Sequence, residues 1–119
     1  MLRELRDTSD AVWECTAKRM VLFRPPFGVT NPVLARTVKK LRFRSIGWSL
    51  KSKDTVIRSA DDLLKRIESK VRAGDVILFH DTMPQLPDVL SRLIPYLQSR
   101  GYVLTRPDHL LNLNPYVVE

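Results

Sequence analysis

The chain has 119 residues, 44% of them hydrophobic and 28% charged, and this composition fits one globular domain over residues 1–119 rather than a disordered protein. No apolar run approaches the roughly 20 residues that span a bilayer, and the charged first residues do not follow a signal-peptide pattern. The sequence thus predicts no membrane partner, and it leaves the localisation of the protein open.

The net charge is +7, from 20 Lys and Arg against 13 Asp and Glu. The densest basic stretch comprises Lys39, Lys40, Arg42 and Arg44. No helix-turn-helix, zinc-finger or RNA-binding pattern accompanies it, so we interpret it as a solvated basic surface and do not expect a nucleic-acid partner. The single cysteine, Cys15, excludes an internal disulfide and a multi-cysteine zinc site, and we expect it to be a small buried residue.

The first elements in chain order are a helix, a strand and a rigid loop. Apolar residues recur at helical spacing over 2–16, and the apolar run 20–23 predicts a buried strand. The strand is followed by the run Arg24-Pro25-Pro26-Phe27-Gly28. Each proline fixes its own φ angle and the second holds the first extended, so the chain leaves the strand in a rigid turn beside a permanent cation.

Three more helices and three more strands follow. The predicted helices cover 32–41, the stretch between Ser59 and Gly74, and 86–100, and the predicted strands cover 43–48, 75–79 and 102–105. Asn31 and Ser59 are typical N-cap residues, and Gly74 and Gly101 are typical of helix C-termini. Residues 49–55 predict a polar loop. Because strands alternate with helices, the sequence predicts an α/β fold with about four parallel strands and right-handed crossovers.

Polar residues follow three of these strands directly, at Arg24, in the 49–54 loop and at His80-Asp81. Because the carboxyl ends of parallel strands share one end of a sheet, we expect these residues to lie together there. His80 has the chemistry of a general acid or base, and Asp54 is a carboxylate that would orient its ring. The structural alternatives stay open at this point: a satisfied structural histidine, a surface aspartate, and a core position for Trp48.

The motifs of this chain resemble those of the polysaccharide deacetylases, a carbohydrate esterase family that removes acetyl groups from N-acetylated sugars. The run Arg24 to Gly28 is similar to the third family motif, residues 46–50 with Asp54 to the fourth, and Leu78-Phe79-His80-Asp81 to the fifth. The chain departs from the fourth motif, with Lys51 where an aspartate is usual and Thr55 where a tryptophan is usual. The resemblance covers residues 18–113.

The resemblance implies a role for each matching residue. Arg24 would position the catalytic aspartate, His80 would be the general acid, and Asp54 would tune it. Phe27 would bind the oxyanion through its backbone N–H, with Trp48 and Leu78 also at the substrate. The implied fold is part of a distorted (β/α) barrel.

Two further family motifs, Thr-Phe-Asp-Asp and His-Ser/Thr-x-x-His, do not occur in this sequence and would lie upstream of Met1. They supply the general base and the ligands of a divalent metal such as zinc, so we expect no metal site in this chain and no activity from it alone. The implied partner is an N-acetylated polysaccharide or oligosaccharide, and the cell envelope is a candidate location for the parent enzyme. We also expect self-association, because a partial barrel leaves an exposed sheet edge.

Two other functions remain open from the sequence. One is a non-catalytic carbohydrate-binding or interaction remnant that has kept the groove and lost the metal. The other is a basic nucleic-acid-binding α/β domain, which a steep salt dependence of DNA binding would favour.

Overall fold

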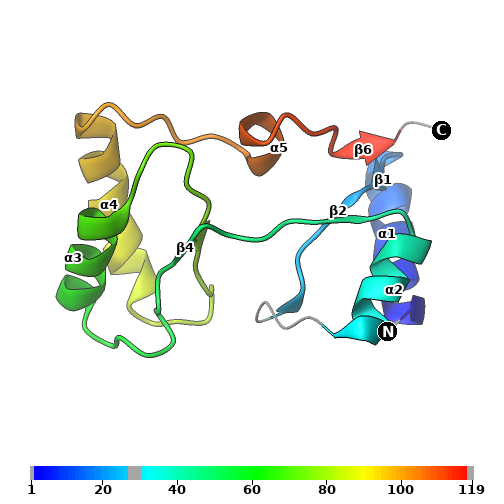
Figure 1. Cartoon of the computed structure of the whole chain (residues 1–119), viewed down its shortest axis with the longest axis horizontal. Coiled ribbons are helices and arrows are strands. Elements are labelled where there is room, and N and C mark those ends of the chain that lie inside the picture. Colours follow the sequence, from blue (N-terminus) through cyan, green and yellow to red (C-terminus); the bar gives the residue numbers. More distant parts are fainter. Residues whose placement is uncertain (1, 27–30, 118–119) are drawn as a thin grey trace. The chain divides into compact units, whose positions relative to one another are not determined.

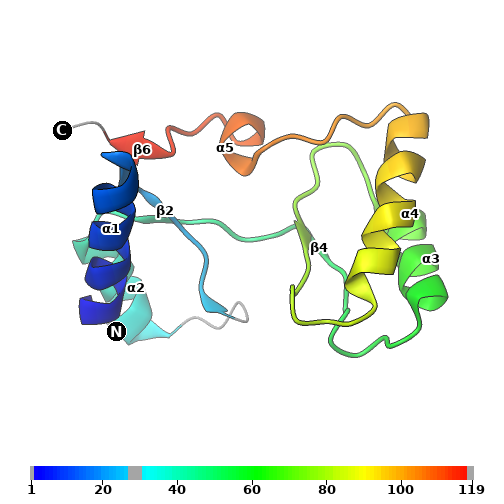
Figure 2. The same cartoon turned by 180° about the vertical axis from the view of Figure 1, so that it is seen from behind.

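The computed structural model describes residues 2–26 and 31–117. They form two compact units (Figures 1 and 2). The first unit comprises Met1–Gly47 and Leu111–Glu119, and the second comprises Trp48–Leu110.

The helices lie close to their predicted positions. They are α1 (Leu2–Thr16), α2 (Pro32–Lys40), α3 (Ala60–Lys70), α4 (Leu86–Ser99) and α5 (Pro107–Leu110). In the described part of the chain, none of them is both long and apolar enough to cross a membrane.

The strands are short and form three pairs. They are β1 (Arg19–Met20), β2 (Leu22–Phe23), β3 (Arg44–Ser45), β4 (Leu50–Lys51), β5 (Ile77–Leu78) and β6 (Tyr116–Val117). β2 pairs with β3 and β4 with β5, both in parallel, whereas β1 and β6 form an antiparallel pair. The mixed α/β fold with parallel strands is therefore confirmed.

Two strand predictions are wrong. β4 lies inside the stretch that was predicted to be a polar loop, because Leu50 is buried opposite Ile77 of β5. The apolar stretch 102–105 forms no strand, and the described residues offer it no pairing partner. Its Val103 is 86% exposed.

The first unit is built from α1, α2 and the strands that follow them. Asn31 caps α2 by accepting a hydrogen bond from the Leu34 N–H at 2.8 Å. Helix α1 packs against β1 through half-buried side chains, but Cys15 lies outside its apolar stripe and is exposed. The prediction that Cys15 is buried is therefore wrong.

The second unit has its core between α3 and α4, which lie side by side in both views (Figures 1 and 2). The buried cluster consists of Leu50, Leu63, Leu64, Ile67, Val89, Leu93 and Leu97. Gly101, at φ +82°, ends α4 in a Schellman motif, with the Gly101 and Tyr102 N–H groups bonded to the Gln98 and Leu97 carbonyls. Gly74 lies beyond the C-cap of α3 at Val71, so it belongs to the following turn and does not close that helix.

Candidate active site

The parallel pair β4–β5 brings two predicted site residues together. Asp54 follows β4 and His80 follows β5, so both leave the carboxyl ends of adjacent strands. His80 Nδ1 lies 2.9 Å from Asp54 Oδ1, and the His80 backbone N–H donates to Asp54 Oδ2 at 2.6 Å. The Asp54 side chain is 1% exposed and that of His80 is 18% exposed. The prediction that these residues lie within side-chain reach is confirmed.

The turn before Asp54 is fixed by Ser52 and Lys53. The buried Ser52 hydroxyl donates to the Leu78 carbonyl at 2.6 Å and accepts the Asp54 N–H at 3.3 Å. Lys53 has φ +67°, a left-handed conformation, and its carbonyl accepts the N–H groups of Val56 and Ile57. These bonds direct the Asp54 carboxylate toward the residues that follow β5.

Two residues that the sequence analysis did not identify, one directly before α4 and one in α3, donate hydrogen bonds to the backbone of this turn. Gln85, directly before α4, donates from Nε2 to the Asp54 carbonyl at 2.7 Å and to the Ile57 carbonyl at 2.9 Å. Arg66 of α3 donates from Nε to the Ser52 carbonyl at 3.1 Å and from Nη2 to the Lys51 carbonyl at 3.2 Å. No local pattern marks either residue, because their partners lie 14 to 31 residues away in sequence.

The hydrogen bonds at Asp54 define what His80 can do. An ionised carboxylate only accepts hydrogen bonds, so the neutral imidazole carries its proton on Nδ1 when it bonds to Asp54. Nε2 is then the atom that takes up or releases a proton, and the carboxylate stabilises the imidazolium that results. This arrangement suits a general acid or base.

Arg24 belongs to the first unit and follows β2. Its Nε donates to the Ile46 carbonyl at 3.2 Å and its Nη2 to the Gly47 carbonyl at 2.9 Å. Arginine has five N–H groups, so these bonds fix the side chain and leave donors, including both on Nη1, for a further acceptor. That Arg24 lies at the same sheet end as His80 stays a prediction.

The other three predicted site residues differ in burial and in whether the structure describes them. Leu78 is 5% exposed, so its side chain belongs to the interior, and its carbonyl is the group that contacts Ser52. Trp48 is half-buried. Phe27 lies outside the described residues, so its role at the oxyanion stays a prediction.

Within residues 2–26 and 31–117, no group of three or more His, Cys, Asp or Glu side chains is arranged to hold a metal ion. The described side chains therefore do not fit a hydrolytic metal ion.

Comparison with known proteins relates this geometry to a family. No family model matches the chain. It is 26% identical to the peptidoglycan-N-acetylglucosamine deacetylase of Bacillus cereus over 104 residues, which cover 83% of this chain and 49% of the relative. It is 28% identical to a chitooligosaccharide deacetylase of Azorhizobium caulinodans over 96 residues, which cover 69% of this chain and 46% of the relative.

The fold leads to the same family. The structure of the peptidoglycan deacetylase PdaC from Bacillus subtilis matches 93% of this chain with a TM-score of 0.82 and 25% identity, and 54% of PdaC is covered. The chain thus spans about half the length of the relatives that it matches. Over that half, in sequence and in fold, the chain is similar to polysaccharide deacetylases.

Proposed function

We propose that this chain provides the proton-donating side of a polysaccharide deacetylase site, which hydrolyses the C–N bond of N-acetyl groups on a sugar polymer. The observation that carries the proposal is the double hydrogen bond between Asp54 and His80. Its support comes from relatives whose names specify the deacetylation of peptidoglycan and chitooligosaccharide.

The proposed step is protonation of the departing nitrogen. When the C–N bond of the tetrahedral intermediate breaks, the amine needs a proton, because an amide anion is a very poor leaving group. His80 donates this proton from Nε2, and the Asp54 carboxylate holds the ring and stabilises its charged form beforehand.

The roles of three other residues in this proposal come from the family resemblance. Arg24 holds the carboxylate of the general base with its remaining donors, the Phe27 N–H meets the oxyanion, and Trp48 offers its flat face to a sugar ring. For these roles we propose that the two units form one domain over residues 1–119.

The reaction also needs a general base and, by the resemblance, a divalent metal such as zinc. The motifs for both are missing from this sequence, so we propose that the 119-residue chain alone is inactive. The chain is purified without chelator, its zinc content is measured, and acetate release from an N-acetylated oligosaccharide is assayed. Stoichiometric zinc with turnover that His80→Ala abolishes would overturn this proposal.

A chimera tests the acid role itself. Residues 18–113 replace the matching segment of Bacillus subtilis PdaC, which supplies the other half of the enzyme. We expect acetate release from the N-acetylated oligosaccharide to fall by about 10²–10⁴-fold in His80→Ala. His109→Ala is the matched control and should retain activity, because His109 is exposed and lies outside the pair. Equal activity of both variants would instead favour a non-catalytic carbohydrate-binding chain.

We also propose self-association through the stretch 102–105. Its sequence is strand-like, yet Val103 and Leu104 are 86% and 51% exposed, and an unpaired apolar segment favours pairing with a second copy. Sedimentation across a wide concentration range should show a dimer that Val103→Lys dissociates, with Val56→Lys as the control at another exposed valine, which is 74% exposed. A monomer at every concentration would contradict the proposal.

A further inference from the structure

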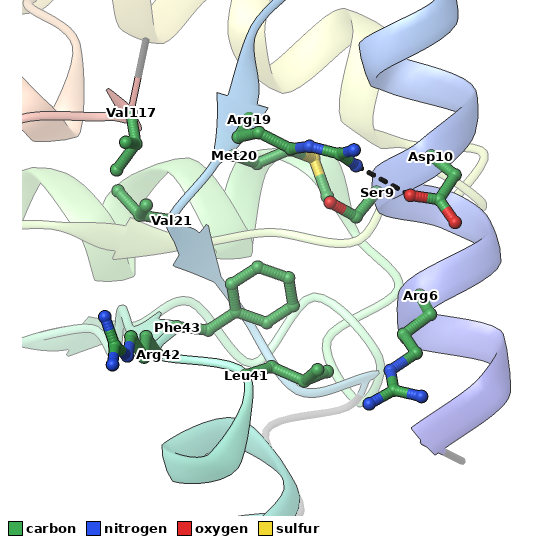
Figure 3. A pocket seen from close by; sticks show the side chains of 10 residues that line it. All are labelled: Arg6, Ser9, Asp10, Arg19, Met20, Val21, Leu41, Arg42, Phe43 and Val117. Atoms are coloured by element: carbon green, nitrogen blue, oxygen red, sulfur yellow. Dashed lines mark hydrogen bonds and ion pairs between the residues drawn. The ribbon is translucent and has the colours of Figure 1, made fainter. Parts of the chain in front are cut away.

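The first unit has a hollow that the proposed reaction does not use. It has a volume of about 400 Å³, in the range of small-ligand sites, and is shown in Figure 3. Its lining comes from α1, β1, the turn after α2, and β6, and comprises Arg6, Ser9, Asp10, Arg19, Met20, Val21, Leu41, Arg42, Phe43 and Val117. The hollow meets β2 and β3 at their amino ends, whereas Arg24 follows the carboxyl end of β2.

The charge of this lining is unbalanced. Among the described residues of the lining, Asp10 is the only acidic one, and it already bonds to Arg19 at 2.6 Å. Arg19 also lies over the Trp13 ring, with the guanidinium carbon 4.9 Å from the ring centroid. Neither Arg6 nor Arg42 has an acidic partner among the described residues. The lining therefore includes two guanidinium groups whose charge no described acidic side chain balances.

The floor of the hollow is apolar. Phe43 and Leu41 lie beneath the Arg19–Asp10 pair, and the Arg6 guanidinium extends toward them from α1 (Figure 3). Phe43 is held in turn by stacking on Phe23, with ring centroids 6.4 Å apart. The hollow thus combines a fixed apolar surface with a cationic rim.

Arg42 occupies a backbone position at which glycine is the usual residue. It follows the C-cap of α2 with φ +58°, and its N–H and that of Phe43 bond to the Lys39 and Val38 carbonyls as in a Schellman motif. A non-glycine residue is strained there, and such strain is often kept at functional sites. The side chain of Arg42 lines this hollow and also an adjoining one of about 340 Å³. The protein thus keeps an arginine that lines both hollows at a backbone position that is strained for it.

We propose that this hollow binds an anionic sugar, with its carboxylate or phosphate group held at the cationic rim to which Arg6 and Arg42 contribute, and an apolar ring face on Phe43. The requirement for negative charge follows from the arginines. That the anionic group is carried by a sugar rests on the proposed function. The hollow would then add a second, charge-selective contact to a glycan.

NMR titration of the 119-residue chain at low salt, with three ligands that share the N-acetylglucosamine ring, tests the proposal. N-acetylglucosamine is neutral, N-acetylmuramic acid adds a lactyl carboxylate to it, and N-acetylglucosamine 6-phosphate adds a phosphate. We expect at least one of the two anions to bind about tenfold or more tightly than the neutral sugar, with shifts at Ser9, Val21 and Phe43. The two anions tell a carboxylate site from a phosphate site.

Two matched pairs of variants test the two arginines, and the first pair separates the side chain of Arg42 from its backbone strain. Arg42→Gly relieves the strain and should raise the melting temperature while weakening anion binding about tenfold or more. Ala17→Gly relieves similar strain at φ +53°, outside the lining, and should leave anion binding unchanged. Arg6→Gln should weaken binding, whereas Arg58→Gln removes the same charge from the second unit and should not.

Several results would overturn the proposal. They are equal binding of the neutral and anionic sugars, shifts centred on His80, and unchanged anion binding by Arg42→Gly. A single-stranded oligonucleotide that binds tighter than both sugars and depends equally on Arg42 would show a surface for polyanions instead. His80→Ala should leave anion binding unchanged, so a failure of this proposal is distinguishable from a failure of the proposed reaction.

Discussion

Asp54 uses both of its carboxylate oxygens to hold His80, a residue 26 positions away in the sequence. One oxygen accepts the backbone N–H of His80 and the other lies 2.9 Å from its ring Nδ1. The same side chain thus fixes the path of the chain after β5 and the orientation of the imidazole. It is 1% exposed, so water does not substitute for either contact.

Asp54→Asn should switch the tautomer of His80. The His80 backbone N–H can only donate, so the asparagine oxygen turns to it and the amide NH₂ then faces Nδ1. Nδ1 must become an acceptor, and the neutral ring carries its proton on Nε2. Ring ¹⁵N chemical shifts above the titration range of histidine would show this switch. Asp81→Asn changes an exposed neighbouring carboxylate and should leave the tautomer as it is, and an unchanged tautomer in Asp54→Asn would show that Asp54 does not set it.

Gln85→Leu should destabilise the second unit by about 1–3 kcal/mol, because it leaves the Asp54 and Ile57 carbonyls without their donor in a buried site. The free energy of unfolding in urea measures this loss. Gln98→Leu is the control, since Gln98 is exposed on α4 and its substitution should change stability by no more than about 0.5 kcal/mol. Equal effects of the two substitutions would show that the bonds of Gln85 contribute little.

The helices could be predicted from sequence because their signals are local. Asn31, Ser59 and Gly101 each lie where the predicted cap or C-terminus was expected, and each makes or accompanies the expected hydrogen bonds. Strands depend on partners that lie far away in sequence. Leu50 is flanked by polar residues and still pairs with β5, whereas the apolar stretch 102–105 stays unpaired within the described residues.

The candidate site was predictable to the same extent. The contact of Asp54 with His80 followed from their positions after adjacent parallel strands, and the family motifs supported it. Gln85 and Arg66 could not be found, because a glutamine before a helix and an arginine within one are ordinary in any sequence. Their role comes only from the packing of α3 and α4 beside the turn that holds Asp54.

Lys53→Gly should stabilise the chain by about 0.5–1 kcal/mol, because φ +67° is strained for lysine and open to glycine. The control is Lys51→Gly, two residues earlier in β4, where glycine weakens a strand and should destabilise. Urea unfolding of both variants gives the two signs. Destabilisation by Lys53→Gly would show that the lysine side chain itself supports the turn.

Asp108 should make the stability of the second unit depend on pH in the acidic range. Burial raises the pKa of Asp108, but the two hydrogen bonds from Arg106, a backbone hydrogen bond and the charges of Arg106 and His109 outweigh it, so the pKa lies below its usual value. The folded state therefore favours the carboxylate. The resulting stability is present above the usual carboxyl pKa and is lost as the pH falls through the lowered one.

Asp108→Asn should accordingly be less stable than the wild type at neutral pH, with the difference shrinking as the pH falls through the lowered pKa. Urea unfolding across this pH range measures the difference. The exposed Asp62 serves as a control, and Asp62→Asn should show a smaller pH dependence. A difference between wild type and Asp108→Asn that is constant with pH would contradict the linkage.

The role of His80 as proton donor is tested most directly by comparing two leaving groups in the chimera with PdaC. Hydrolysis of an N-acetylated oligosaccharide releases the sugar amine, a leaving group that must be protonated. Hydrolysis of p-nitrophenyl acetate releases p-nitrophenolate, which needs no proton. We predict that His80→Ala lowers kcat/KM by about 10²–10⁴-fold for the oligosaccharide and by less than about tenfold for the ester. Equal losses on both substrates would contradict a general-acid role for His80.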